Sequence, residues 1–328
     1  MWINRSRHVP VLRDEAVSAL TTAGAGTYID ATFGGGGYAE AILGVAGARV
    51  IGLDRDPEAA VRGAALAAAN SQFAMLEGRF GELTGLLAER GVDKVDGLVA
   101  DIGVSSFQLD QAERGFSFRA DGPLDMRMSQ SGRSAADLVN EAGEAELADL
   151  IYRLGEEPQS RRIARAIVRQ RSQRPIRTTG ELQAIVATAK GRGRPGRDPA
   201  TQTFQALRMA VNDELAELDA LLTQCLTLLR PGGRLVVVTF HSLEDRLVKR
   251  FVDAAGGSRS EGSRHAPAIV AGPAKLRWVH RRVIKPSATE IEHNPRARSA
   301  KLRVAERTEE DLAESDPELS SLLWRAAA

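Results

Sequence analysis

Three aspartates, Asp30, Asp54 and Asp101, each end an apolar, β-branched run, and four glycines at 34–37 follow the first of them. The carboxyl ends of parallel strands share one edge of a sheet, and ligands bind there. Glycine lets the backbone turn tightly and approach a ligand, and the helix that follows offers free N–H groups. This spacing predicts a site for a nucleoside-containing cofactor.

The first two aspartates bear on which cofactor that is. Asp54 stands eighteen residues after Gly36, where an acid accepts hydrogen bonds from ribose hydroxyls, as it does in NAD enzymes. Asp30 would repel a pyrophosphate but suits an ammonium group, which favours S-adenosylmethionine over a dinucleotide. A structural role for Asp30, capping the N–H groups of the turn, is the alternative.

Candidate reacting groups follow the later strands. Asp101 ends the fourth predicted strand, beside the cofactor, and is the candidate catalytic residue. Ser105 lacks the second glycine of a nucleophile elbow, so hydrolase chemistry is disfavoured. His241 begins the helix after the fifth strand and faces the same edge, with helix capping by Ser242 as its alternative. The other histidines and Cys225 show no metal-ligand spacing, so we predict no metal.

Strands and helices alternate over residues 27–103, with strands expected at 49–54, 73–76 and 96–101 after the first. Repeated βα units predict an α/β fold with a parallel, Rossmann-like sheet covered by helices on both faces. A fifth strand is predicted at 234–240, and 276–284 and 299–305 are candidates for closing antiparallel strands.

The middle of the chain breaks this pattern. Residues 104–135 indicate a long loop, 136–189 have a helical period, and 191–196 indicate a linker. One long helix is then predicted from Asp198 until Pro231 stops it. The chain is therefore expected to have a discontinuous α/β domain (1–110 and 200–307), an insertion (111–199) and an acidic, flexible tail (308–328).

Composition excludes several classes of protein. The 328 residues are 43% apolar and 27% charged, and the single cysteine rules out an internal disulfide. The net charge of +1 hides two basic blocks, twelve Arg/Lys over 153–197 and ten over 275–307. These indicate a polyanionic partner or solvated helix faces. Without a signal peptide or a membrane-length apolar run, the chain is expected to be cytoplasmic.

Several motifs together resemble the RsmH (MraW) family of ribosomal small-subunit RNA cytosine-N4 methyltransferases. The resemblance spans nearly the whole chain. It is carried by His8–Leu12, Asp30–Tyr38, Asp54–Pro57, Asp101–Asp110, Gly115–Phe118, Asp121–Arg127, Ser160–Ala164, Thr203–Arg208, Val211–Leu215, Phe240–Asp245 and Asn294–Ser299. Tyr38 stands where many relatives have His, and Phe107 where Pro is common.

The resemblance implies a Rossmann-like class I methyltransferase with an inserted helical domain, which would recognise RNA. It implies transfer of a methyl group from S-adenosyl-L-methionine to a cytidine N4 of 16S rRNA, within a small ribosomal subunit, and leaves a homodimer open. The implied cofactor contacts are Gly36, Gly37, Tyr38, Asp54, Phe80, Asp101 and Gln108.

The expected mechanism is in-line alignment, with Asp101 or the backbone carbonyls of 102–104 accepting an amine hydrogen. The base would stack on Phe107, Phe116 or Phe118. Phosphates would bind Arg161, Arg165 and Arg169, which are four apart on one helix face, and the 275–307 block. An NAD-dependent oxidoreductase, a non-enzymatic RNA-binding protein and a DNA methyltransferase are the alternatives.

Overall fold

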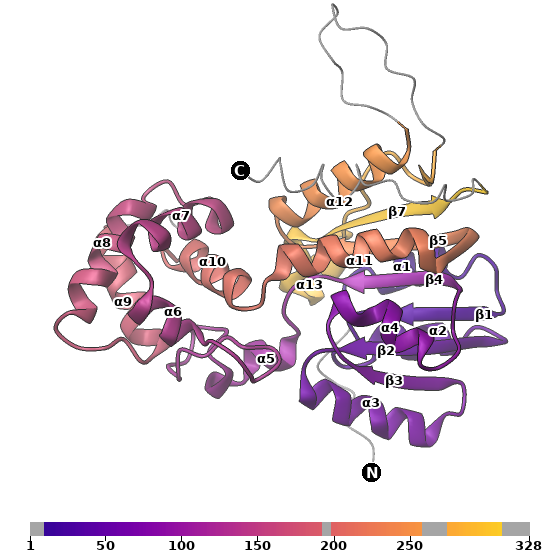
Figure 1. The fold of residues 1–328 in the computed structure, drawn as a ribbon, viewed down its shortest axis with the longest axis horizontal. Helices are drawn as coiled ribbons and strands as arrows, with labels where there is room; N and C mark the ends of the chain where they lie inside the picture. The colour runs from indigo at the N-terminus through magenta and orange to yellow at the C-terminus, as the bar shows by residue number, and fades with distance from the viewer. Residues whose placement is uncertain (1–9, 192–197, 258–273, 310–328) are drawn as a thin grey trace, which may run out of the picture. The chain divides into compact units, whose positions relative to one another are not determined.

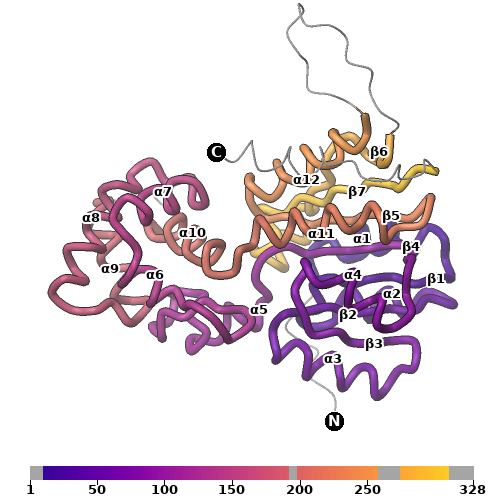
Figure 2. The backbone as a smooth tube through the Cα atoms, viewed as in Figure 1, coloured from indigo at the N-terminus to yellow at the C-terminus, as the bar shows by residue number. Residues whose placement is uncertain are grey.

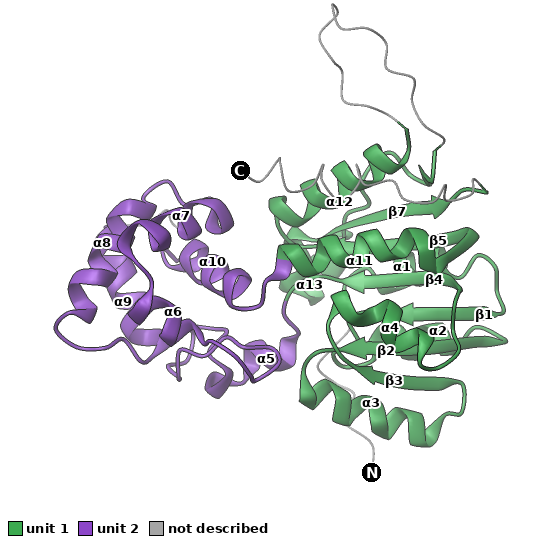
Figure 3. Ribbon diagram, in the orientation of Figure 1, with its two compact units in different colours: residues 1–103, 215–328 green, residues 104–214 purple. Residues whose placement is uncertain are grey.

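The computed structural model describes residues 10–191, 198–257 and 274–309. They form two compact units (Figure 3): unit 1 comprises Met1–Gly103 with Leu215–Ala328, and unit 2 is Val104–Glu214. Unit 1 contains the sheet and unit 2 is helical. Among the described residues, no helix is long and apolar enough to cross a bilayer.

Unit 1 is built on a seven-stranded sheet of order β3-β2-β1-β4-β5-β7-β6 (Figure 1). Strands β1 to β5 are parallel, and β7 pairs antiparallel with both β5 and β6. The bounds are β1 Gly26–Asp30, β2 Ala48–Asp54, β3 Phe73–Glu77, β4 Val95–Asp101, β5 Leu229–Thr239, β6 Leu276–Trp278 and β7 Lys301–Arg307. The predicted parallel sheet is confirmed, and the two closing strands are antiparallel as expected.

Helices cover both faces of this sheet because alternate strand residues are apolar on each side. Ile29 and Leu98 pack with α4 (Leu83–Ala88), α11 (Glu214–Leu228) and α12 (Ser242–Ala255) on one face. Tyr28 and Val99 pack on the other face with α1 (Arg13–Leu20), α2 (Gly37–Leu43) and α3 (Pro57–Ala69). Cys225 is buried in the first of these two layers.

The strand register brings the predicted site residues to one edge. Asp30, the last residue of β1, pairs with Gly52 of β2 and Val99 of β4. Asp54 and Asp101 are the last residues of β2 and β4, and these strands run parallel to β1. All three aspartates therefore stand at the carboxyl edge of the sheet.

Unit 2 has its own apolar core, to which every one of its longer helices contributes. In this unit α8 lies beside α7 and α9 (Figure 2), and α10 packs on α6 and α7. The helices are α5 Ser106–Asp110, α6 Ala135–Glu141, α7 Glu144–Gly155, α8 Ser160–Arg171, α9 Thr179–Lys190 and α10 Thr201–Val211. The region 104–135, expected to be a loop, contains α5 and the short 3-10 helix Ala112–Arg114.

The prediction of one long helix after Asp198 is wrong. The chain forms α10 and α11, which are separated at Asp213, a residue with φ of +51°. Phe204 and Leu207 of α10 pack in the core of unit 2, whereas Leu218 and Leu222 of α11 pack in unit 1. The apolar residues of α10 and α11 recur with one helical period in the sequence. Because each helix buries these residues in a different core, that periodicity did not reveal the break.

The boundaries of the two units therefore differ from the predicted domain boundaries. The insertion predicted at 111–199 is replaced by a unit at 104–214, so α5 and α10, both assigned to the α/β domain, belong to the helical unit. The start of the predicted 191–196 linker, Gly191, is described, and the rest of it lies outside the described residues. The predicted acidic tail, 308–328, lies outside them beyond residue 309.

Candidate functional site

The turn from β1 into α2 is organised by the buried carboxylate of Asp30. Its Oδ1 accepts a hydrogen bond from the Thr32 N–H at 3.2 Å, and its Oδ2 accepts one from the Ala39 N–H at 3.1 Å. The structural role considered for Asp30, capping the N–H groups of the turn, is therefore what the structure shows. Burial also raises the pKa of Asp30 to about 7, the largest cause being desolvation.

We expect the stability of the protein to depend on pH through Asp30. The folded chain holds this proton at pH values where the unfolded chain has lost it. The stabilisation is thus fully present below pH 3.8 and lost as the pH rises through about 7. Between about pH 5 and 8 this amounts to roughly 2 to 3 kcal/mol of unfolding free energy. Urea unfolding of the wild type and Asp30→Asn at both pH values measures it.

In this experiment the wild type should lose more stability than Asp30→Asn between the two pH values. At low pH the variant should itself be less stable, since its amide nitrogen faces one of the two N–H donors. Parallel pH profiles of the two proteins would contradict the assignment.

The glycines of the turn are required by contacts within the chain. Gly36 has φ of +82°, and a Cβ built there would lie 2.9 Å from the Phe33 ring. A Cβ on Gly37 would lie 2.2 Å from Pro10. Within the described residues, the N–H groups of Gly37 and Tyr38 have no acceptor, so they remain available to a ligand.

The side chain of Tyr38 belongs to the protein core. Its ring is buried and its hydroxyl donates a hydrogen bond to the Val11 carbonyl. The structure thereby gives the tyrosine at this position a structural partner. A cofactor contact from Tyr38 would be made by its backbone N–H.

Asp54 joins the glycine turn to the start of α3. Its Oδ2 accepts the Gly34 N–H at 2.7 Å and its Oδ1 the Asp56 N–H at 2.9 Å. Each oxygen keeps a second lone pair for a ribose hydroxyl. The Asp54 pKa is raised, chiefly by burial and against these two hydrogen bonds.

Phe80 follows the carboxyl end of β3, in the 3-10 helix Phe80–Glu82. The residue is half-buried and packs against the core, and its carbonyl accepts the Gln224 side chain at 2.6 Å. Phe80 stands three residues after Glu77, the last residue of β3, which runs parallel to β2. This position is consistent with the adenine contact that the resemblance implies.

Asp101 ends β4 with an unsatisfied buried acceptor. Its N–H donates to Thr32 Oγ1 at 2.7 Å, but its Oδ1 is buried and has no hydrogen-bond partner in the described part of the chain. Its pKa is raised well above the usual value, mainly by burial and then by the charges of Asp30 and Glu244. A buried acceptor without a donor is costly in a finished core and is typical of a site that receives a ligand.

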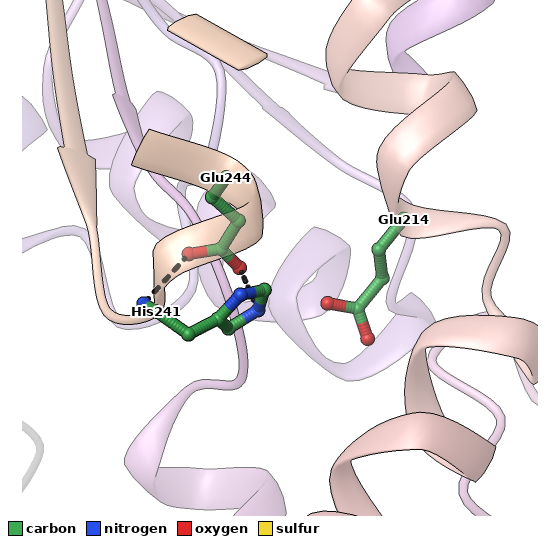
Figure 4. A group of neighbouring side chains, drawn as sticks. All are labelled: Glu214, His241 and Glu244. Carbon is green, nitrogen blue, oxygen red and sulfur yellow. Dashed lines mark hydrogen bonds and ion pairs between the residues drawn. The ribbon is translucent and has the colours of Figure 1, made fainter. Parts of the chain in front are cut away.

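His241 and Glu244 stand at the start of α12 (Figure 4). His241 Nε2 lies 2.7 Å from Glu244 Oε1, and Glu244 Oε2 accepts the Phe240 N–H at 2.9 Å. The cap residue of α12 is His241, with Glu244 reaching back to it, so the alternative that Ser242 caps this helix is not what the structure shows. Glu214, also drawn in Figure 4, pairs with Arg208 of its own helical unit at 2.7 Å.

The predicted site residues of the helical unit differ in how far they are buried and in what they contact. Gln108 is buried, and its Oε1 accepts the Ser105 N–H at 3.0 Å while Ser105 Oγ caps α5. Ser105 is thus a helix cap. Phe116 is buried and Phe118 packs edge-on against Phe204 with ring centroids 4.8 Å apart. Phe107 is half-buried, so it stays a candidate for stacking on a base.

Much of the second basic block is engaged inside unit 1. Lys301 and Arg303 pair with Asp245 at 2.9 and 2.6 Å, and Arg277 pairs with Glu306. Arg307 is buried and donates to the Leu226 carbonyl. These bases hold β6, β7 and α12 together, which reduces the charge that 275–307 can offer to a polyanion.

The sheet order and the helices on both of its faces define an α/β protein of the Rossmann-like class. The MraW methylase family model matches residues 5–308, and the chain belongs to this family. It is a methyltransferase with the class I fold, which decides against the oxidoreductase and non-enzymatic alternatives.

Several similar proteins are named Ribosomal RNA small subunit methyltransferase H, and two of them illustrate the similarity. The one from Acidiphilium cryptum is 54% identical over 304 residues, covering 92% of this chain and 97% of its own. The one from Methylobacterium nodulans is 55% identical over 321 residues, covering 96% and 94%. A putative rRNA methylase of Clostridium thermocellum is 11% identical, with a TM-score of 0.41 over 92% of this chain and 99% of that one, too distant to carry an argument.

Sequence reasoning missed two groups near Asp101. Thr32 accepts the Asp101 N–H, and Glu244 contributes to the raised Asp101 pKa. The spacing of His241 and Glu244, three residues apart at a helix start, is that of a capping box and could have indicated Glu244. Nothing in the sequence linked Thr32 to Asp101, because the two residues are 69 positions apart.

Proposed function

We propose that this methyltransferase moves a methyl group from S-adenosyl-L-methionine to the exocyclic N4 amine of a cytidine in 16S rRNA. The observation that carries the proposal is the buried, unpartnered Oδ1 of Asp101 at the carboxyl edge of the sheet. The family and the names of its relatives indicate the small ribosomal subunit as the source of that base. We place the reaction in the cytoplasm, where that substrate is found.

The donor and acceptor groups of unit 1 suit this cofactor. The free N–H groups of Gly37 and Tyr38 would bind its carboxylate, and Asp54 would accept its ribose hydroxyls. Phe80 would pack on the adenine. When bound, S-adenosylmethionine supplies a methyl group that its positive sulfonium has already activated. The prediction that no metal takes part stays a prediction.

Asp101 would orient and activate the amine. A cytosine amine is a weak nucleophile, since its lone pair is delocalised into the ring. Accepting one amine hydrogen at Asp101 Oδ1 would aim that lone pair at the methyl and stabilise the positive charge that develops on nitrogen. The backbone carbonyls of 102–104 are the alternative acceptors. Holding the amine in line is itself a large contribution to the rate.

The base must leave its stack to reach this edge, which is easiest in single-stranded or looped RNA. Of the three aromatic side chains predicted to stack on it, Phe116 is buried, whereas Phe107 and Phe118 are half-buried. Phe118 packs against Phe204, so we favour Phe107. We assign the helical unit to RNA recognition, because its exposed arginines give it a basic surface.

The test is methyl transfer from labelled S-adenosylmethionine to undermethylated small ribosomal subunits, with naked rRNA and DNA in parallel. Label recovered as N4-methylcytidine from rRNA is the expected result. Label in DNA alone, or in another nucleoside, would overturn the proposed substrate.

A further inference from the structure

Unit 2 contains a groove of about 630 Å³ that is lined by α8, α9 and the segment 174–176 between them. This volume is in the range of small-molecule and nucleotide sites. The buried face of α8, with Ile163 and Ile167, packs in the unit's core, so the groove lies on the opposite, exposed side of the helix.

The groove has two chemically different parts. Apolar side chains make up one part: Ala166, Pro175, Ile176, Ala184, Ile185 and Ala189. Guanidinium groups make up the other: Arg162, Arg165, Arg169 and Arg174. The stripe on α8 follows the spacing i, i+3, i+7, so Arg162 lies in the groove and Arg161, predicted to bind phosphate, does not.

Among the described residues that line the groove, Glu181 is the one acidic residue, and both of its carboxylate oxygens already accept hydrogen bonds. Its Oε1 accepts from Arg174 at 2.7 Å, and its Oε2 accepts the Arg177 N–H at 2.8 Å. The latter hydrogen bond is the largest cause of the lowered Glu181 pKa. Arg165 lies 3.6 Å from Glu144. Arg162 and Arg169 have no partner among the described residues, so their charge is available to a ligand.

We infer that this groove binds one stretch of single-stranded RNA, with phosphates on Arg162 and Arg169 and a base or ribose against the apolar part. This rests on the proposed function and names the surface that holds the substrate. The two arginines are seven residues apart, about 10 Å along the helix, far enough to take different phosphates of one strand. A free anion would leave the apolar part exposed, and a duplex hides its bases from it.

The test compares variants of the full chain that lose the same charge. The double variant Arg162→Ala/Arg169→Ala removes the two arginine side chains of the groove that have no partner among the described residues. Arg119→Ala/Arg177→Ala removes two exposed arginines of the same unit that do not line it. The probe is a short fluorescein-labelled oligouridylate, read by anisotropy over a range of salt. Because it contains no cytidine, its binding is independent of methyl transfer.

The groove double variant should bind this probe about tenfold more weakly, with a salt dependence reduced by about 0.7 per lost phosphate contact. The control double variant should change affinity about twofold or less. Equal losses in the two would show diffuse charge and overturn the inference. So would a polyglutamate peptide that binds more tightly than the RNA and loses that binding in the groove variant.

A second pair of variants tests the apolar part without changing charge. Ala184→Leu on α9 adds bulk at an exposed groove position, and Ala187→Leu adds it on the same helix outside the groove. Weaker RNA binding, about fivefold, is expected for the first variant and none for the second. Unchanged binding in Ala184→Leu would overturn the placement of a base or ribose there.

The failure of the proposed function is distinguishable from failure of this inference. A wild type that binds oligouridylate through the groove but does not methylate rRNA would refute the proposed reaction alone. A wild type that methylates ribosomal subunits, with an unchanged KM in the groove variant, would refute the groove alone.

Discussion

Asp101→Ala should lower the turnover of rRNA methylation by about 10² to 10⁴-fold, the range for a positioned acid or base. The alanine removes the buried Oδ1 that would accept the amine hydrogen. Asp101→Asn keeps an oxygen acceptor but not the charge, so its loss should be smaller. Because Asp101 is also an implied cofactor contact, cofactor affinity should fall in both variants, but by much less than turnover. Single-turnover transfer and calorimetric cofactor binding measure these quantities.

The pH profile separates a catalytic role for Asp101 from a structural one. Burial and the charges of Asp30 and Glu244 raise the Asp101 pKa, so the carboxylate form is lost at a higher pH than usual. Turnover of the wild type should therefore rise as the pH passes the raised pKa of Asp101, and Asp101→Asn should lose this rise. Asp93→Asn, an exposed aspartate before β4, is the matched control and should behave as wild type. Full turnover in Asp101→Ala would refute the assignment.

Asp54→Ala should weaken S-adenosylmethionine binding by at least about 100-fold, since it removes two charged hydrogen-bond acceptors, each contributing about 1.5 to 3 kcal/mol. The same carboxylate also holds the N–H groups of Gly34 and Asp56, so the turn should loosen as well. Isothermal titration with S-adenosylmethionine measures the affinity.

A folding control keeps this result interpretable. Asp56→Ala removes the cap of α3, where Asp56 Oδ1 accepts the Glu58 N–H at 3.1 Å, two residues from Asp54. It should lower stability by about 1 kcal/mol and leave cofactor affinity within a few-fold. If Asp54→Ala stayed folded and bound the cofactor as wild type does, Asp54 would not be the ribose acceptor. Equal losses of affinity in both variants would point to the loop as a whole.

The local sequence was sufficient to predict the strands of the sheet and the edge at which the candidate site residues stand. A β-branched run that ends in an acid is a property of neighbouring residues, and parallel strands put their last residues at one edge. The positions of Asp30, Asp54 and Asp101 at the ends of such runs therefore predict that the three carboxylates share that edge. The glycine turn was equally predictable, because positive φ and close approach are demands on single residues.

The tertiary structure alone decided where the chain divides and which charges are free. The apolar residues of α10 and α11 follow one continuous helical period in the sequence. The break at Asp213 appears only in the structure, where the two helices pack in different cores. Likewise Lys301 and Arg303 meet Asp245 across more than fifty residues of chain. Partners this distant are chosen by packing, so a basic block in the sequence does not reveal which of its members remain available to RNA.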